Sequence, residues 1–391
     1  MEKKKKIYTI ATAHLDTCWL WTYEKTVSTF VPGTLRENFA LFEKFPDYKF
    51  NFEGSNRYEL MQEYYPEEFE KLRHYIKQGR WHPCGSCYEN GDVNTPSPEA
   101  LTRNILYGNG YFRKIFGVES NDIYLPDCFG FGRALPCVAA HSGLTGFSTQ
   151  KLTWGGSVDV PFDIGRWTGK DGKGIWCALK PGAYTNVAGN VRKNRRATAN
   201  LRDNEQYGNS KTFIYHGTGD RGGGPAKASV RNIQKAVRLN DKNDIKVFSS
   251  TTKEFFDDLE RLTDEQKKAM PVFDGELLLT EHGAGSYTSR TVTKRWNRRA
   301  ELLADAAERF SVAAVNEGLA DYPDKAFETA WKKVILHQFH DDITGTSFEE
   351  CYKRSHNDYV QAMHSFSSEY TAAMKALSSQ LETSFVKGTA V

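Results

Sequence analysis

The stretch Ile7-Tyr-Thr-Ile-Ala-Thr-Ala13 decides the fold, because a short apolar and β-branched run ends there at two ionisable residues, His14 and Asp16. A run of this length and composition predicts a buried β-strand. Lysines at positions 3–6 precede it, as basic residues precede the apolar part of a secretion signal. The apolar stretch is only seven residues long and continues directly into His14. We therefore interpret it as the first strand of the fold.

The first 280 or so residues alternate short β-rich runs with helical patterns, which is typical of βαβ units and a mostly parallel sheet. A helix is expected after Ser97, where a serine can cap the first turn and a proline fits its first position. A hairpin turn is predicted at 171–172, between Trp167 and Trp176. The expected strands are 7–12, 48–52, 122–125, 146–150, 212–215, 245–248 and 272–273.

From about Tyr287 the strand signals stop and long helical patterns begin. These patterns cover 296–310, 326–340 and 348–385. We therefore expect two domains, an α/β domain at 1–284 and a helical bundle domain at 285–391.

The composition is that of an ordinary folded protein, with 39% hydrophobic residues, 26% charged residues and a net charge of +3. The basic residues are scattered, so nucleic acid is not an expected partner. Apolar runs stay far below the roughly 18 residues needed to cross a bilayer, so no membrane association is expected. The seven cysteines are odd in number and unevenly spaced, which favours a reducing cytoplasm over a disulfide framework. Cys84-Gly-Ser-Cys87 is a weak match to a redox or zinc motif.

Four segments carry clustered ionisable residues, and three of them directly follow an expected strand, where the loops of parallel α/β folds usually build their sites. In the first, His14 and Asp16 point to the same side of an extended backbone and can hold one ion. Such a His-x-acid pair is expected about once by chance in this composition, so it needs corroboration. In the second, Asp127 ends a strand and could be a nucleophile, a metal ligand or a helix N-cap.

The third segment is the glycine-rich loop Gly217-Thr-Gly-Asp-Arg-Gly-Gly-Gly224, between an expected strand and a helix. It contains Gly-x-Gly-x-x-Gly. Asp241 follows at nearly the sequence spacing of the acidic residue that contacts ribose in dinucleotide-binding folds, so a dinucleotide site is compatible with this loop. Asp220 argues against that reading, because it would put a negative charge beside pyrophosphate. The glycines could instead let the backbone approach a sugar and present one carboxylate. Arg221 would favour the ionised form of Asp220.

The fourth segment, His340-Asp341-Asp342, lies at the end of an expected helix. Neighbouring carboxylates beside a histidine compete for one cation. A metal ion would resolve that crowding.

Taken together, these segments resemble those of the zinc-dependent α-mannosidases of glycoside hydrolase family 38. The matching motifs occur in order along nearly the whole chain. They are His-x-Asp-x-x-Trp at 14–19, Pro-Asp-x-Phe-Gly at 126–130, Gly-Asp-x-Gly-Gly-Gly at 219–224, Tyr-Thr-Ser-Arg at 287–290 and Gln-x-His-Asp at 338–341. The resemblance implies a distorted seven-stranded α/β barrel followed by an α-helical bundle. Members of that family continue into large β-domains, so we expect a chain ending at Val391 to lack them and to turn over substrate poorly.

The resemblance also implies roles for individual residues. The sequence departs from the family pattern at Glu281-His282, where a residue commonly separates the two, and no role is carried onto either. The residues with implied roles are the metal ligands His14, Asp16, Asp127 and His340, the nucleophile Asp127, the acid/base Asp220, the sugar-packing residues Trp19 and Phe129, and Asp341, which would hydrogen-bond near the metal.

A retaining glycosidase needs two carboxyl groups about 5–5.5 Å apart, one to attack the anomeric carbon and one to protonate the leaving oxygen. Asp127 and Asp220 would supply them. A metal ion would keep Asp127 ionised and could bind sugar hydroxyls, in this family the 2- and 3-hydroxyls of mannose. The ligand set is compatible with one Zn²⁺ ion, and Co²⁺ or Mn²⁺ could also occupy it. We therefore expect a cytoplasmic, retaining α-mannosidase whose partner is an α-mannoside glycan; a homo-oligomer is compatible with the sequence.

Three alternatives remain open at this point. A zinc-dependent carbohydrate deacetylase would use a metal-bound water as nucleophile and would form no covalent sugar adduct on Asp127. A nicotinamide-dependent oxidoreductase would use the glycine-rich loop and would bind nicotinamide. A non-catalytic sugar-binding protein would bind metal and mannose without hydrolysing an aryl mannoside.

Overall fold

Strand β1 (Lys6–Ala13) is the centre of the first sheet, and seven of its eight residues are buried. The computed structural model describes residues 4–388 and pairs β1 in parallel with β8 (Lys211–Thr218) along its whole length. The other edge of β1 is covered first by β9 (Lys246–Ser250) and then, at Thr12, by β2 (Phe50–Glu53). Because these strands are parallel, their carboxyl ends meet at one edge of the sheet.

The second sheet has the order β10 (Val272–Asp274), β6 (Ile164–Thr168), β7 (Gly174–Ala178), β5 (Gly146–Ser148) and β4 (Asp122–Tyr124). It is parallel except at the hairpin between β6 and β7. The hairpin confirms the turn predicted at 171–172, where the amide of Gly169 donates to the carbonyl of Lys173 at 2.8 Å. Strand β3 (Trp81–Cys84) pairs with β2 and completes the first sheet.

Each of the seven expected strands overlaps an observed one, β6 and β7 are the two arms of the predicted hairpin, and β3 was not expected. Strand pairing within residues 4–388 gives two five-stranded sheets. The mixed α/β class with parallel sheets is therefore confirmed, whereas a closed seven-stranded barrel stays a prediction.

Helices flank the sheets in the alternating order expected of βαβ units. The helix predicted after Ser97 is confirmed, because the Ser97 hydroxyl accepts a hydrogen bond from the amide of Ala100 at 3.2 Å. The helices of this region are α1 (Tyr23–Lys25), α2 (Val31–Lys44), α3 (Ser55–Tyr64), α4 (Pro66–Lys77), α5 (Pro98–Phe116), α6 (Ala134–His141), α7 (Arg195–Glu205), α8 (Lys227–Arg238), α9 (Thr252–Glu260) and α10 (Asp264–Ala269), with short turns η1 (Thr26–Phe30), η2 (Lys151–Trp154), η3 (Val191–Lys193), η4 (Asn240–Lys242) and η5 (Ala284–Thr288).

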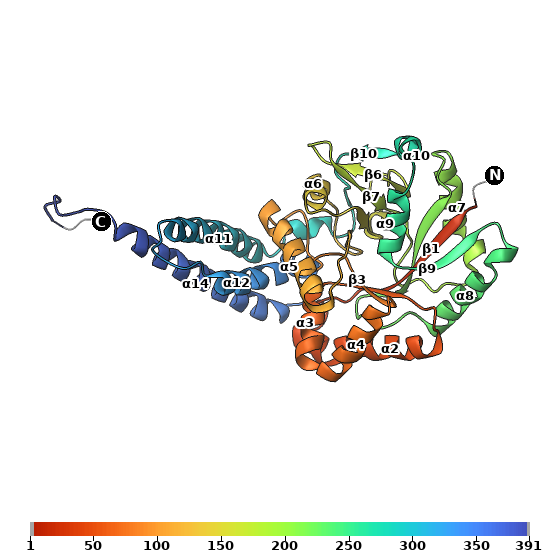
Figure 1. Cartoon of the computed structure of the whole chain (residues 1–391), viewed down its shortest axis with the longest axis horizontal. Coiled ribbons are helices and arrows are strands. Elements are labelled where there is room, and N and C mark those ends of the chain that lie inside the picture. The colour runs from red at the N-terminus through yellow and green to blue at the C-terminus, as the bar shows by residue number, and fades with distance from the viewer. Residues whose placement is uncertain (1–3, 389–391) are drawn as a thin grey trace.

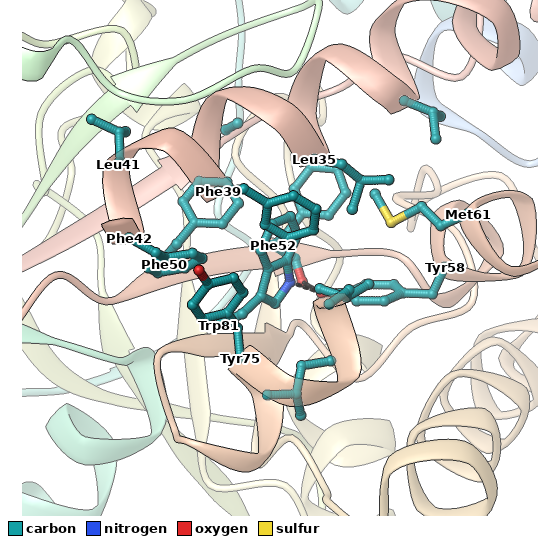
Figure 2. Close-up of a cluster of buried hydrophobic side chains, with 14 of the residues drawn as sticks. Leu35, Phe39, Leu41, Phe42, Phe50, Phe52, Tyr58, Met61, Tyr75 and Trp81 are labelled. Carbon is teal, nitrogen blue, oxygen red and sulfur yellow. Dashed lines mark hydrogen bonds between the residues drawn. The ribbon is translucent and has the colours of Figure 1, made fainter. Parts of the chain in front are cut away.

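A cluster of buried aromatic rings fixes β2 and β3 against helices α2 to α4 (Figure 2). Phe50 and Trp81 lie on paired strands and their rings contact at 4.8 Å between centroids. The indole nitrogen of Trp81 donates to the Tyr58 hydroxyl at 2.9 Å. Each such ring stabilises the fold by about 1.5–3 kcal/mol through burial. This packing holds the carboxyl end of β2 in place, where Glu53 lies.

Long helices project to one side of the sheets and lie side by side (Figure 1). They are α11 (Thr291–Asn316), α12 (Asp324–Leu336) and α14 (Cys351–Ser378), with the short α13 (His340–Ile343) between the last two. The helix expected at 326–340 is wrong in its last turn, since α12 ends at Leu336 and the chain turns before α13. None of the helices within residues 4–388 combines the length and the apolar character needed to cross a membrane. The domain boundary at 284/285 stays a prediction, and positions 1–3 and 389–391 of those two domains lie outside the described residues.

Candidate active site

Side chains from three distant parts of the chain meet beyond the carboxyl end of β1. The Nε2 atom of His14 lies 2.8 Å from Oδ1 of Asp16. The Nε2 atom of His340 lies 3.5 Å from the same oxygen and 3.9 Å from Oδ2 of Asp127. His14, Asp127 and His340 can each place one ligand atom within 4.8 Å of the others, and so can Asp16, His340 and Asp341. The structure therefore brings together the four side chains expected to bind a metal.

The chemistry of this cluster fits a divalent cation. Nε2 of His14, Oδ1 of Asp16 and Nε2 of His340 are buried and have no hydrogen-bond partner among the described residues. The His14 and Asp16 atoms are close, yet they are not aligned for a hydrogen bond. Buried polar atoms are nearly always paired, and each orphan costs about 1–3 kcal/mol. Two imidazoles with carboxylates are a ligand set that Zn²⁺ accepts.

The other nitrogen of each imidazole has a fixed partner. His14 Nδ1 lies 3.1 Å from Oε1 of Glu53, and His340 Nδ1 lies 2.9 Å from the carbonyl oxygen of Asn90. A proton on Nδ1 leaves the lone pair on Nε2 directed into the cluster. Neither Glu53 nor Asn90 was predicted from the sequence. Glu53 is the last residue of β2, so the rule that sites follow strand ends could have found it.

Electrostatics in the cluster depend on burial and on close charges. Burial lowers the pKa of His14, but Asp16 and Glu53 raise it more, so the pKa lies well above its ordinary value. Burial acts to raise the pKa of Asp16, but His14 and His340 hold it well below the usual range. Burial raises the pKa of Asp341 to about 7, and the charges of Asp16 and Asp127 add to this effect. Protons and a cation would therefore compete for this site.

Lys151 is a further member of the site that sequence reasoning missed. Its Nζ donates to Oδ1 of Asp127 at 2.6 Å, and the lysine side chain is only 2% exposed. The ammonium also lies 5.0 Å from the ring centroid of Phe129 and 4.5 Å from that of Trp154. Asp127 thus turns one oxygen toward Lys151 and the other toward His340. Lys151 lies three residues after β5, so the strand-end rule applied to it as well.

Asp220 lies two residues after β8 in an unusual backbone conformation, with φ at 65° for a residue other than glycine. Such strain is most often tolerated where function requires a side chain to be aimed. Its Oδ1 accepts a hydrogen bond from the Tyr184 hydroxyl at 2.8 Å, and its carbonyl accepts from the amide of Asp16 at 2.8 Å. Within residues 4–388 the guanidinium of Arg221 forms no ion pair with Asp220 and instead lies 5.9 Å from the Trp21 ring centroid.

The glycine-rich loop does not offer the donors that a dinucleotide site needs. The amide of Gly222 donates to the carbonyl of His14, that of Gly223 to the Thr34 hydroxyl and that of Gly224 to a Glu37 carboxylate oxygen, each at 2.8 Å. These nitrogens cannot also bind pyrophosphate, and Glu37 would repel it. The geometry of these three amides therefore argues against the interpretation as a nicotinamide site.

The cysteine pair Cys84 and Cys87 lacks the surroundings of a reactive thiol. Both side chains are buried, and all seven cysteines are free thiols in the structure. Burial raises the pKa of Cys87 to about 12 and that of Cys84 well above its ordinary value. Reactive cysteines instead have lowered pKa values, so the structure gives no support to a redox role for this motif.

A cavity of about 340 Å³ opens over the cluster. The two residues expected to pack on a sugar, Trp19 and Phe129, both line it. His282, to which no role was assigned, also lines it, with its ring centroid 5.0 Å from that of Trp154 and 6.2 Å from that of Phe129. The lining residues are Asp16, Trp19, Asp127, Phe129, Lys151, Trp154, Tyr184, Asp220, His282, Gly283, Asp341 and Thr346.

Comparison with known proteins places the chain among carbohydrate enzymes. The sequence model of the glycosyl hydrolases family 38 N-terminal domain matches residues 4–276, and that of the alpha mannosidase middle domain matches residues 282–377. Alpha-mannosidase G of Dictyostelium discoideum is 30% identical over 353 residues, which are 90% of this chain and 31% of that protein. The alpha-mannosidase of Saccharomyces cerevisiae is 30% identical over 373 residues, which are 94% of this chain and 34% of that protein.

The fold agrees with these matches. The crystal structure of an alpha-mannosidase from Enterococcus faecalis V583 superposes with a TM-score of 0.81 at 21% identity, covering 98% of this chain and 44% of that one. The chain spans about a third of the length of the curated relatives it matches. The family model covers well over half of the sequence, and the chain therefore belongs to glycosyl hydrolase family 38.

Proposed function

We propose that this chain carries the active site of a retaining, metal-dependent α-mannosidase that hydrolyses terminal α-mannosidic bonds. One observation carries the proposal: the carboxylate of Asp127 lies between a buried group of orphaned histidine and aspartate atoms and the ammonium of Lys151. Membership of family 38 and similarity to α-mannosidases over most of the chain support it.

His14, Asp16, Asp127 and His340 would hold one Zn²⁺ ion, with Co²⁺ or Mn²⁺ as alternatives. When bound, the ion supplies a Lewis acid that stabilises the ionised form of Asp127 and binds adjacent hydroxyls of the sugar. Glu53 and the carbonyl of Asn90 hold the two imidazoles in the orientation that this requires.

Asp127 attacks the anomeric carbon, and a covalent glycosyl-aspartate forms. Lys151 holds the second oxygen of that carboxylate and limits its rotation. Asp220 donates a proton to the leaving oxygen and then accepts one from the water that hydrolyses the covalent bond. The Tyr184 hydroxyl fixes the Asp220 carboxyl for both steps.

Trp19 and Phe129 pack on the sugar ring, and Asp341 hydrogen-bonds a sugar hydroxyl beside the metal ligands. Thr346 donates to Asp341 and holds its carboxyl in place. The partner is an α-mannoside glycan. The cytoplasmic location and a homo-oligomeric state remain predictions.

A fluorinated mannosyl fluoride tests the nucleophile, because it reacts with a retaining mannosidase and leaves a slowly hydrolysed adduct. We expect mass spectrometry of the digested protein to locate the label on the peptide that contains Asp127. The matched control is Asp127→Asn, which should acquire no label. A label on another residue would refute the assignment of Asp127. Absence of any adduct, together with acetate release from an acetylated sugar, would favour the deacetylase.

A further inference from the structure

Asn90 lies behind the cluster of proposed metal ligands. It contacts His340 directly, and it contacts the hydrogen-bond partner of His14 and the chain neighbour of Asp127. Its side chain is 1% exposed. Nδ2 of Asn90 donates to Oε1 of Glu53 at 3.3 Å, and that oxygen also contacts Nδ1 of His14. The carbonyl oxygen of Asn90 lies 2.9 Å from Nδ1 of His340. Its Oδ1 lies 3.7 Å from the thiol of Cys128, the neighbour of Asp127 along the chain.

We propose that Asn90 is a positioning residue that sets the orientation of His14 and His340 together, so that both present Nε2 to one cation. The inference rests on the proposed function, because it concerns the same metal site. The side chain and the backbone carbonyl of Asn90 would together couple His14, which follows β1, to His340, which begins α13.

The side chain at position 90 has to be an amide. Its Nδ2 has two acceptors within reach, Oε1 of Glu53 at 3.3 Å and the carbonyl of Tyr124 at 3.2 Å. An amide nitrogen can donate to both. A carboxylate of the same shape could donate to neither, and it would add a negative charge beside Glu53. Repulsion would move the Glu53 carboxylate, and His14 would lose the partner that sets its orientation.

The carbonyl of Asn90 is fixed by a second buried network. The backbone N–H of Asn90 donates to Oε1 of Glu89 at 2.6 Å, and Glu89 forms a buried ion pair with Arg57 at 2.8 Å. Nε of Arg57 donates at 3.1 Å to the carbonyl of Leu15, the residue between His14 and Asp16. The backbone that orients His340 is therefore tied to the backbone that carries the first two ligands.

The test is the isosteric variant Asn90→Asp in the full chain, compared with Asn109→Asp. Asn109 is also buried, and its Nδ2 donates to the carbonyl of Ser120 at 3.0 Å. The control therefore loses a similar side-chain hydrogen bond whose partner is not a residue of the metal cluster. We measure the affinity for Co²⁺ by chelator competition, the visible absorption spectrum of the Co²⁺-loaded protein, and thermal unfolding of the metal-free protein.

We expect Asn90→Asp to bind Co²⁺ about 10- to 100-fold more weakly and to alter the Co²⁺ spectrum, as loss of a partner behind a ligand usually does. Asn109→Asp should keep the wild-type affinity and spectrum. If Asn90→Asp does not fold, Asn90→Ala is the test variant. It removes the hydrogen bonds of the side-chain amide without adding charge and should still weaken Co²⁺ binding.

An unchanged Co²⁺ affinity and spectrum in a folded position-90 variant would overturn the inference, and so would an equal loss of affinity in Asn109→Asp. If the wild-type chain itself binds no Co²⁺, the metal site of the proposed function fails, and the inference fails with it. A wild-type chain that binds Co²⁺ while the position-90 variants behave like it would reject the inference alone.

Discussion

Replacing Lys151 by methionine tests the ion pair that holds Asp127. Methionine keeps most of the aliphatic stem, so the main loss is the ammonium that donates to Asp127 at 2.6 Å. Removing one partner of a buried pair costs about 3–5 kcal/mol, because the other charge is left uncompensated. Asp127 is 15% exposed and can be partly hydrated, so we expect the free energy of unfolding of the metal-free protein to fall by about 3 kcal/mol. A carboxylate free to rotate should also lower kcat about 10²-fold.

Urea unfolding of chelator-treated protein measures the first effect, and hydrolysis of an aryl α-mannoside by the metal-loaded protein measures the second. Lys253→Met is the matched control, because Lys253 pairs with Asp257 at 2.7 Å while 45% exposed and should cost no more than about 0.5 kcal/mol. If Lys151→Met is as stable as this control, the pair does not stabilise the fold. If kcat is also unchanged, Lys151 does not orient Asp127.

Three further predictions concern pH, the acid/base and the metal. Asp342 and Asp358 raise the pKa of the buried His337 to about 9 against the effect of burial, so its stabilisation is fully present below about pH 6.5 and is lost as pH rises through 9. In chelator-treated protein, His337→Gln should therefore flatten this part of the stability profile in urea unfolding, by about 3 kcal/mol at most, and an unaltered profile would contradict the charge assignment. Asp220→Asn should lower kcat/KM about 10²- to 10⁴-fold for an alkyl mannoside and far less for a nitrophenyl mannoside, whereas equal losses would exclude a role as general acid. Removal of metal by a chelator should lower the Tm, and Zn²⁺ at 1,000 times its Kd should restore about 4 kcal/mol, which calorimetry can check; a Tm indifferent to both would mean that no site is present.

The fold could be predicted where the sequence pattern is local. The apolar β-branched run at 7–13 gave the central strand, and Ser97 gave the start of α5. Strand β3 was missed because Trp81-His-Pro-Cys84 is short and contains a proline, which is atypical of a paired strand. The end of α12 was missed because the apolar pattern continues past Leu336. The turn after the helix is stabilised by tertiary contacts, such as the hydrogen bond from the Gln338 side chain to Asn297 of α11.

The residues of the candidate site also include some that the sequence could predict and some that it could not. His14, Asp16 and Asp127 could be found because each follows a strand within a few residues, and this position in the fold is visible in the sequence. Glu53 and Lys151 obey the same rule and were overlooked because no motif marks them. The position of Asn90 could not be predicted, because its importance comes from contacts with β2, β4 and α13, which are far apart along the chain.

The charges at the site favour the binding of a cation. Asp16, Asp127 and Asp341 approach one another among buried imidazoles, and Lys151 contacts only one of these carboxylates directly. Burial and the neighbouring carboxylates raise the pKa of Asp341 to about 7 when no cation is present. A bound divalent ion reverses this effect and favours the ionised form, so binding of the ion must release protons from Asp341 and from the imidazoles. The affinity for metal should therefore fall as the pH is lowered, because more than one proton competes with each ion, and Co²⁺ titrations at several pH values can check this.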